Sequence, residues 1–235
     1  GLHIPVIQES PGGGKGMKNQ PAVALRFKPR DGYSLEPGSP RNQLGLRFSA
    51  RGSRFKNDIQ VQTLTSGPLG HEADEIRVGC RLEFPEGTGI LTITSPDVNV
   101  QPNLDYQFLV ETSDRTRLRE AVRECAELFE DPGFQSVIDS RISPTTEQLA
   151  SDELLDDWLD STLSIAGHTC RTCKMGPASD PQAVVDQYCQ VHGIEGLRVI
   201  DASVMPEIPT ANTNATTIMI AERTADLINE GKGAS

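Results

Sequence analysis

The last third of the sequence holds the residues best suited to acid–base chemistry. His168 lies within the run 167–177, and Asn214 lies within the run 209–215, just before an apolar segment. A histidine titrates near neutral pH, so its imidazole can take the proton of a hydroxyl group. An asparagine can hold the same oxygen through a hydrogen bond and fix its direction. The pair therefore suits removal of a proton from an alcohol.

Residues 212–214 also open the last helix that the sequence predicts, which runs from about Asn214 to Asn229. The first N–H groups of a helix lack partners and carry partial positive charge, so they suit an anionic ligand. Asn212 or Asn214 could instead serve only as the helix cap, and the spacing alone favours that simpler interpretation. The helical period predicts that the helix buries Ile218, Ala221, Ala225 and Ile228.

The cysteines support a competing interpretation. Cys170-x₂-Cys173 is followed, after fifteen residues, by Cys189-x₂-His192, which is close to the spacing of a zinc ribbon. A zinc-stabilised binding module built on these four residues is the main alternative function. Two observations weigh against it, because Cys189 falls within a predicted helix and His192 suits its last turn without any metal. We therefore predict no metal site.

Composition and charge exclude several classes of protein. The 235 residues carry a net charge of −11, which argues against nucleic acid and against an anionic membrane surface. No apolar run reaches the roughly 18 residues of a membrane span. Five cysteines, an odd number, favour reduced thiols rather than a disulfide framework, and a cytoplasmic location is the default expectation. The sequence begins at Gly1 without Met, so we expect that it continues an upstream segment.

A glycine-rich stretch near the start, Pro11–Gly16, resembles a phosphate-binding loop only superficially. The Walker pattern needs Ser or Thr after Gly-Lys, and Gly16 follows Lys15 here. We interpret residues 1–20 as a connector.

The order of the predicted elements indicates the fold class. Strands are predicted at residues 22–27, 44–48, 59–65, 76–84 and 87–95, separated by turns rich in Gly, Pro and Asp. Four helices follow, as their capping residues and apolar spacing indicate. They lie at about residues 114–130, from residue 151, at residues 180–192 and at the C-terminus. A strand at residues 197–200 precedes the C-terminal helix. Strands first and helices later predict an α+β fold with an antiparallel sheet.

Several helical details are specific enough to test. Ser113 or Asp114 is expected to cap the first helix, and Cys125 is expected to lie in the core. The helix from Ser151 should bury Leu154, Leu155, Trp158 and Leu159, with its acidic residues solvated rather than bound to metal. The helix at 180–192 has Asp180 as its cap, Pro181 in the first position and Gly193 just beyond its end.

The whole pattern resembles the C-terminal half of the glucose–methanol–choline (GMC) oxidoreductases. That family carries a His-x-x-Gly-Thr-Cys-Arg-Met-Gly run, which residues 168–176 match at five positions: His168, Thr172, Cys173, Met175 and Gly176. Four later motifs of the family have counterparts here in the same order. Residues 184–186 are similar to its Val-Val-Asp motif and residues 193–199 to its Gly-x-x-Gly-Leu-Arg-Val motif. Residues 201–206 are similar to its Asp-Ala-Ser-x-Met-Pro motif and residues 212–215 to its Asn-Thr-Asn-Ala motif. Residues 11–21 are similar to the family's connector, with Asn19-Gln20 where Asp-His is usual.

The resemblance implies an FAD-dependent alcohol oxidase or dehydrogenase that acts on a CH–OH donor. His168 would be the catalytic acid/base and Asn214 its partner, with hydride passing to flavin N5. Asp201 and Ala202 would contact the ribityl–pyrophosphate part of FAD, and Asn212 and Thr213 would lie near the pyrimidine edge of the flavin. Cys173 would be structural. A reaction that uses the flavin only structurally, such as a lyase reaction, is a further alternative on the same fold.

The sequence departs from the family in three further respects. Arg171 replaces a glycine, and Lys174 replaces an arginine. The Gly-x-Gly-x-x-Gly fingerprint of the nucleotide-binding half is absent from these residues. We therefore expect an N-terminal FAD-binding chain as partner, in a two-chain or cleaved enzyme. By this resemblance, residues 21–165 form the substrate-binding domain, and residues 166–235 carry the catalytic motif and complete a Rossmann-like FAD-binding domain.

Overall fold

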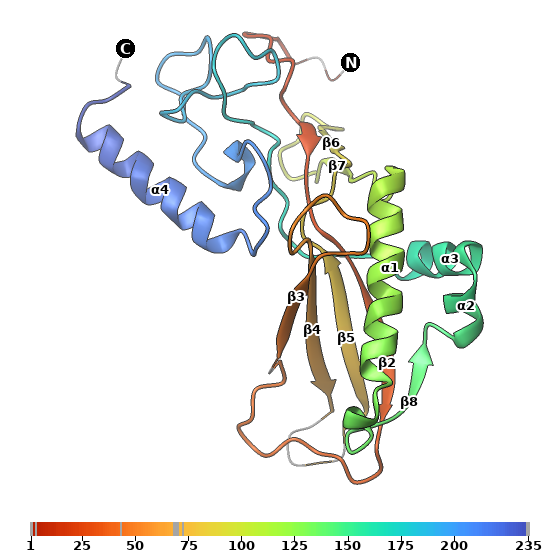
Figure 1. Ribbon diagram of the computed structural model, residues 1–235. Coiled ribbons are helices and arrows are strands. Elements are labelled where there is room, and N and C mark those ends of the chain that lie inside the picture. The colour runs from red at the N-terminus through yellow and green to blue at the C-terminus, as the bar shows by residue number, and fades with distance from the viewer. Residues whose placement is uncertain (1, 3, 43, 68–70, 72, 234–235) are drawn as a thin grey trace. The chain divides into compact units, whose positions relative to one another are not determined.

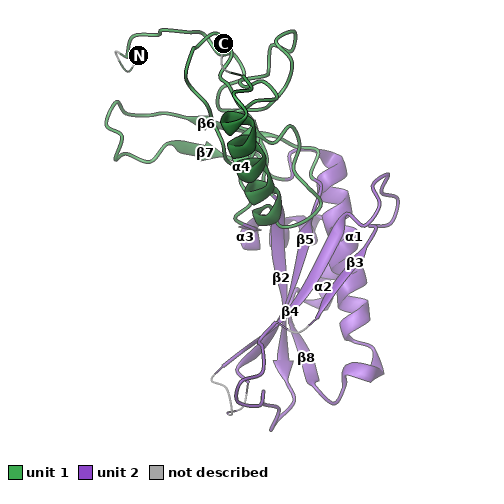
Figure 2. Ribbon diagram, turned by 90° about the vertical axis from the view of Figure 1, so that its left-hand side faces the viewer, with its two compact units in different colours: residues 1–19, 85–108, 167–235 green, residues 20–84, 109–166 purple. Residues whose placement is uncertain are grey.

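The computed structural model describes residues 2, 4–42, 44–67, 71 and 73–233 (Figure 1). The chain forms two compact units, each assembled from separate segments (Figure 2). Unit 1 comprises residues 1–19, 85–108 and 167–235, and unit 2 comprises residues 20–84 and 109–166. Antiparallel sheets with helices make up the structure, so the predicted α+β class is confirmed.

Unit 2 is built on a six-stranded antiparallel sheet in the order β3–β4–β5–β2–β8, and β9 also pairs with β2. The sequence predicted four of these strands and missed β8 and β9. β8 has only two apolar residues, Ile138 and Ile142, with three polar residues between them, and β9 has only two residues. The strand bounds are β2 Pro21–Pro29, β3 Gly45–Phe48, β4 Ile59–Ser66, β5 Glu75–Leu82, β8 Ile138–Ser143 and β9 Ser164–Ile165.

Alternation along the strands gives this sheet one apolar face. Leu25 of β2 and Val78 of β5 are opposite each other in the register and fully buried. Helix α1 (Thr112–Phe129) packs on β5 and β4 and adds its own buried stripe, which includes Cys125 as predicted. The helix begins earlier than expected, since Glu111 is its N-cap and makes no side-chain cap bond.

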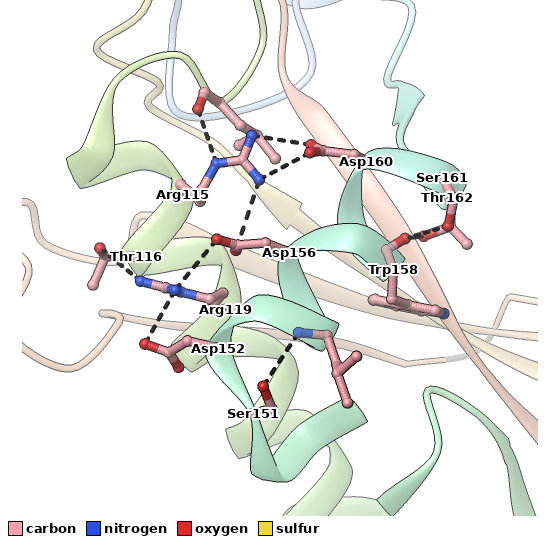
Figure 3. Close-up of polar contacts among 12 residues, drawn as sticks. Arg115, Thr116, Arg119, Ser151, Asp152, Asp156, Trp158, Asp160, Ser161 and Thr162 are labelled. Carbon is pink, nitrogen blue, oxygen red and sulfur yellow. Dashed lines mark hydrogen bonds and ion pairs between the residues drawn. The ribbon is translucent and has the colours of Figure 1, made fainter. Parts of the chain in front are cut away.

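Helix α3 (Asp152–Thr162) follows the short helix α2 (Thr146–Ala150) and packs against α1. Ser151 is the N-cap of α3, so the predicted start of this helix at about Ser151 is confirmed. Leu155, Trp158 and Leu159 are buried, whereas Leu154 is exposed. The acidic residues of α3 bind arginines of α1, with Arg115 on Asp160 at 3.0 Å and Arg119 on Asp152 at 3.1 Å (Figure 3).

Unit 1 contains a small antiparallel sheet, a long looped region and helix α4 (Asn214–Asn229). The sheet has the order β1–β6–β7, formed by Lys15–Met17, Gly89–Thr92 and Asn103–Asp105. Isolated bridges join the looped segments, and Val184, Val185, Cys189 and Val204 form their buried cluster.

The predicted helix at 180–192 is wrong. Residues 180–193 form turns and isolated bridges instead. The Asp186 carboxylate accepts hydrogen bonds from the backbone N–H groups of Tyr188 and Gln190, and Cys189 has a φ of 60°. These local bonds compete with helical ones. The predicted strand at 197–200 is likewise reduced to the single bridge of Gln190 with Arg198.

The predicted extent of α4 is confirmed, but its predicted buried stripe is wrong. Thr224 and Leu227 are buried, whereas Ile218 is 53% exposed and Ile228 is 45% exposed. Ala221 and Ala225 are exposed as well. None of the helices in the described part of the chain combines the length and apolar character needed to cross a membrane.

Candidate active site

His168 lies in a segment that the connector holds in place. The backbone N–H of His168 donates to Asn19 Oδ1 at 3.0 Å, and the His168 residue is 8% exposed. Two residues further on, Cys170 exchanges backbone hydrogen bonds with Lys18, at 3.0 and 3.1 Å. The main chain around the candidate base is therefore fixed on both sides of Thr169.

Thr169 joins three segments of unit 1 through its hydroxyl group. Asn19 Nδ2 donates to Thr169 Oγ1 at 3.1 Å, and the hydroxyl groups of Tyr106 and Thr169 are 2.8 Å apart. The Tyr106 ring stacks on Phe108 with centroids 5.0 Å apart and planes 2° apart. This network orients the residue that follows His168 and limits the movement of the segment.

Lys18 anchors the connector from the other side. Its buried ammonium group donates to the carbonyl groups of Pro85 at 2.6 Å and Glu86 at 3.1 Å, and it lies 3.6 Å from the Glu207 carboxylate. Hydrogen bonds to a charged donor are stronger than neutral ones. Lys18 therefore joins the connector to two other parts of unit 1.

Arg171 occupies the position where the family motif has glycine, and it adopts the backbone conformation that favours glycine. Its φ is 74°. Its guanidinium group donates to the Pro206 carbonyl at 2.9 Å and to the Gly16 carbonyl at 3.0 Å. The Arg171 side chain thus ties the connector to the 201–206 segment through the several N–H donors of its guanidinium group, and a glycine has no side chain to do this.

The 201–206 segment runs beside the His168 motif. Backbone N–H groups of Arg171, Cys173 and Met175 donate to the carbonyl groups of Ala202, Ser203 and Val204. Asp201 caps the short turn that follows, since its carboxylate accepts from the Ser203 backbone N–H at 2.8 Å and from the Ser203 hydroxyl at 2.5 Å. The structure therefore brings together the predicted residues Asp201 and Ala202 and the His168 motif.

The start of α4 is polar and accessible. Thr213 is the N-cap but makes no side-chain cap bond, and it is buried, while Asn212 and Asn214 are exposed. The simpler interpretation, in which an asparagine caps the helix through its side chain, is therefore wrong. Asn214 is the first residue of a 16-residue helix, so its position is set by a rigid element.

The zinc alternative is wrong for the part of the chain that the structure describes, in which no group of three or more His, Cys, Asp or Glu side chains could hold a metal ion. Cys189 lies 3.4 Å from the Thr224 hydroxyl, and His192 Nε2 is 3.0 Å from the Gly176 carbonyl. Burial raises the pKa of the Cys170 thiol to about 12 and also raises the pKa of Cys173. Both residues are therefore thiols at neutral pH, which suits packing rather than redox chemistry.

Sequence reasoning missed the residues that support the site. Asn19, Lys18 and Tyr106 do not stand in any motif that performs chemistry by itself. The similarity of residues 11–21 to the family connector was the signal available for Asn19, although it gave no role. Tyr106 carried no signal, because its partner Thr169 is 63 residues away.

Comparison with known proteins identifies the group to which these features belong. A family model described as GMC oxidoreductase matches residues 85–221. An oxygen-dependent choline dehydrogenase of Photobacterium profundum is 39% identical over 144 residues, which cover 61% of this chain and 25% of the relative. An oxygen-dependent choline dehydrogenase of Escherichia coli O127:H6 is 32% identical over 260 residues, which cover 98% of this chain and 46% of the relative.

Solved structures share the fold over nearly the whole chain. Pyridoxine 4-oxidase from Mesorbium loti superposes with a TM-score of 0.85 at 21% identity, over 97% of this chain and 46% of that protein. The chain thus spans less than half the length of these proteins.

Proposed function

The chain belongs to the GMC oxidoreductase family of FAD-dependent flavoproteins, and from this membership we propose that it supplies the acid–base pair of an enzyme that oxidises an alcohol to a carbonyl compound. The observation that carries the proposal is the position of His168. It is a mostly buried histidine on a main chain held by Asn19, Lys18 and the 201–206 segment. A base held in this way needs little reorganisation during the reaction.

His168 is the proton acceptor in this proposal. An imidazole nitrogen of His168 takes the hydroxyl proton of the substrate, because the ordinary pKa of histidine is close to neutral pH. The Asn214 amide donates a hydrogen bond to the same oxygen and fixes its direction. His168 later returns the proton to solvent, so the residue ends the cycle unchanged.

The residues at the start of α4 fit the FAD that the family uses. The N–H groups in the first turn have no side-chain cap from Thr213, and they lie beside the exposed Asn212 and Asn214. A helix N-terminus stabilises negative charge, which suits the pyrimidine edge of a flavin. Asn212 and Thr213 would hold that edge, while Asp201 and Ala202 would hold the ribityl–pyrophosphate part. When bound, FAD supplies the acceptor for the substrate's hydride.

An N-terminal part must complete the enzyme, because these residues lack the nucleotide-binding fingerprint and the relatives are about twice as long. The exposed side of α4 is a suitable contact surface for it. Ile218 and Met219 are 53% and 56% exposed, and Ala221, Ala225 and Ile228 extend the same apolar surface. Large exposed apolar patches mark interaction surfaces. We propose that an FAD-binding part, in the same polypeptide or a separate one, covers this surface.

The substrate class follows in outline from the relatives. Two of them are named for choline, so choline is one candidate, together with other primary and secondary alcohols.

The test is His168→Ala in the enzyme that includes its N-terminal part. We expect kcat to fall by about 10²- to 10⁴-fold, as is usual when an acid–base group is lost. The visible flavin spectrum should stay native. His71→Ala is the matched control, because His71 is an exposed histidine of unit 2 and should leave kcat unchanged. Near-normal turnover by His168→Ala, with native flavin absorption, would contradict the assignment.

A further inference from the structure

A cavity of about 210 Å³ lies in unit 2, on the face of the six-stranded sheet against which α1 packs. All ten residues that line it belong to unit 2, so this unit forms the cavity by itself. Helix α1 ends at Phe129, near the end of the sheet at which β4 ends and β5 begins (Figure 1). Phe129 is one of the lining residues, so the cavity lies where the helix ends over the sheet.

The floor of the cavity coincides with a change of residue type along β4. Side chains alternate between the two faces of a sheet, so Ile59, Val61, Thr63 and Thr65 of this strand face the same way. Ile59 and Val61 are buried, whereas Thr63 and Thr65 are half-buried and line the cavity. Ile76, the register partner of Thr65, is buried beside them. The floor therefore offers two hydroxyl groups on an otherwise apolar surface.

The walls of the cavity are aromatic. Phe129 and Phe134 form part of one wall, with ring centroids 4.9 Å apart. Tyr33 lines the cavity from a turn that hydrogen bonds hold in place. The Tyr33 backbone N–H donates to the Arg30 carbonyl at 2.9 Å, and the Arg30 N–H donates to the Val137 carbonyl at 2.8 Å. Val137 also lines the cavity, so the main chain ties these walls to each other.

Arg41 is the one charged residue among those that line the cavity. Two hydrogen bonds connect it to β4. The Thr65 backbone N–H donates to the Arg41 carbonyl at 3.2 Å, and Arg41 Nη1 donates to the Thr65 carbonyl at 3.3 Å. A guanidinium group has five N–H donors, so this side-chain bond leaves others to offer. The charge of the lining is therefore positive, which favours an anionic ligand.

The size and the lining of the cavity define the ligand. An apolar cavity of about 150 Å³ accepts benzene, so this one has room for a six-membered ring with a small substituent. Phenylalanine and tyrosine rings pack well on another aromatic ring, and arginine donates charge-assisted hydrogen bonds to a carboxylate. We propose that the cavity binds a small aromatic carboxylate, with its ring against Phe129 and Phe134 and its carboxylate beside Arg41. This site goes beyond the proposed alcohol oxidation and does not depend on it.

The test compares three ligands of nearly the same shape. Benzoate is an anion, benzamide is neutral and benzamidine is a cation. Isothermal titration calorimetry of the complete holoenzyme measures their affinities. We expect saturable binding of benzoate, about three- to tenfold tighter than that of benzamide, because Arg41 is exposed and solvent screens its charge. Benzamidine should bind most weakly. Adding about 1 M NaCl should reduce the preference for benzoate, since salt screens exposed charges.

Two variants assign the binding to this cavity. Arg41→Gln should remove the preference for benzoate over benzamide. Arg51→Gln is the matched control, because it removes the same charge from a 78% exposed arginine of unit 2 that does not line the cavity. Thr63→Phe fills the cavity with a side chain that strands favour. It should abolish binding of all three ligands, with an unchanged or raised unfolding midpoint.

A third variant separates this cavity from the candidate active site. His168→Ala should bind benzoate as tightly as the wild type does, since His168 belongs to unit 1. Loss of benzoate binding in His168→Ala would place the ligand at the candidate active site and would overturn the proposal.

Other results would also overturn it. They are the absence of saturable binding at millimolar benzoate, equal affinities for benzoate and benzamidine in the wild type, and normal benzoate binding by folded Thr63→Phe. If Thr63→Phe fails to fold, Arg41→Gln decides, because an unchanged preference for benzoate in that variant would contradict the role of Arg41. A benzoate-dependent loss of self-association in sedimentation would assign the cavity to a second copy of the chain instead.

Discussion

Asn19 and His168 are 149 residues apart in the sequence, and the Asn19 side chain accepts a hydrogen bond from the His168 backbone N–H at 3.0 Å. The same side chain donates to the Thr169 hydroxyl. One amide thus uses its acceptor and its donor on consecutive residues of the candidate catalytic segment. Asn19 is 2% exposed, so water cannot easily replace it.

This relationship predicts different results for two substitutions of Asn19. Asn19→Ala leaves the His168 N–H without its acceptor, so we expect a loss of about 1–3 kcal/mol in the free energy of unfolding and a lower kcat. Asn19→Asp keeps an acceptor for His168 and can accept from Thr169, so its kcat should be nearly normal, although burial of a carboxylate lowers the free energy of unfolding. Urea unfolding and steady-state kinetics of the two variants check this. An equal loss of kcat in both variants would show that the hydrogen bond to His168 is not what matters.

Arg171 permits a test of backbone strain against side-chain contact. Its φ of 74° suits glycine, and its side chain bonds Gly16 and Pro206. Arg171→Gly and Arg171→Ala both lose these bonds, but only the alanine variant keeps an unfavourable backbone. We expect Arg171→Gly to be more stable than Arg171→Ala by about 1 kcal/mol in urea unfolding. A more stable alanine variant would contradict the strain argument.

Glu75 should make stability depend on pH. The hydrogen bond from Arg26 is the main cause that holds the pKa of Glu75 below its ordinary value of 4.5, and Arg77 adds to it. The stabilisation is therefore fully present above pH 4.5 and is lost as the pH falls through the lowered pKa. Because the Arg26 side chain is 49% exposed, solvent screening limits the effect, and we expect Glu75→Gln to cost about 1 kcal/mol at pH 7.

The measurement is thermal unfolding of the wild type and Glu75→Gln between pH 7 and pH 3. The difference between the two proteins should shrink toward the acid end. A difference that stays constant over this range would show that the ionised carboxylate is not its source.

The exposed side of α4 predicts a defect in assembly without a defect in folding. Ile218→Glu places a charge on a side chain that is 53% exposed, so unit 1 should unfold at its usual temperature. Association with an N-terminal part expressed separately should weaken at least tenfold, because a buried unpaired charge is costly at an interface. Co-purification and flavin absorbance report the association. Val110→Glu, which alters a 72% exposed valine of unit 2, should associate normally.

The sequence predicted the parts of the fold in which local pattern and tertiary packing agree. Helices α1 and α3 and strands β2 and β4 have strong apolar periods that match the faces they bury. The segment at 180–192 has good helix end signals but is not helical. The Asp186 carboxylate accepts hydrogen bonds from nearby backbone N–H groups, and the segment packs in the buried cluster of the looped region of unit 1. Val185 of this segment is buried and forms bridges with Met175 and Val191, and no local period reveals these pairings.

The prediction of which residues of α4 are buried failed for a different reason. The helix is apolar on more than one side, with Leu227 and Thr224 buried and Ile218 and Met219 exposed. A period can identify an apolar face, but it cannot tell a face that packs within the chain from one that packs on something else. The supporting residues Asn19 and Tyr106 could not be predicted, because their roles depend on contacts 149 and 63 residues away.

The interleaving of the two units has a consequence for the order of folding. Residues 19 and 168 meet only after the intervening chain has closed a long loop, and the entropy cost of closure grows with loop length. Within unit 2, β2 pairs with β9, so Pro21 lies opposite Ile165, and Ala166 bonds to the Gln20 carbonyl. Folding of unit 2 by itself therefore closes that loop and removes most of the entropy cost of the Asn19–His168 bond. We expect the candidate base to be assembled after the sheet, so that a mutation that slows the sheet also delays the appearance of an active enzyme.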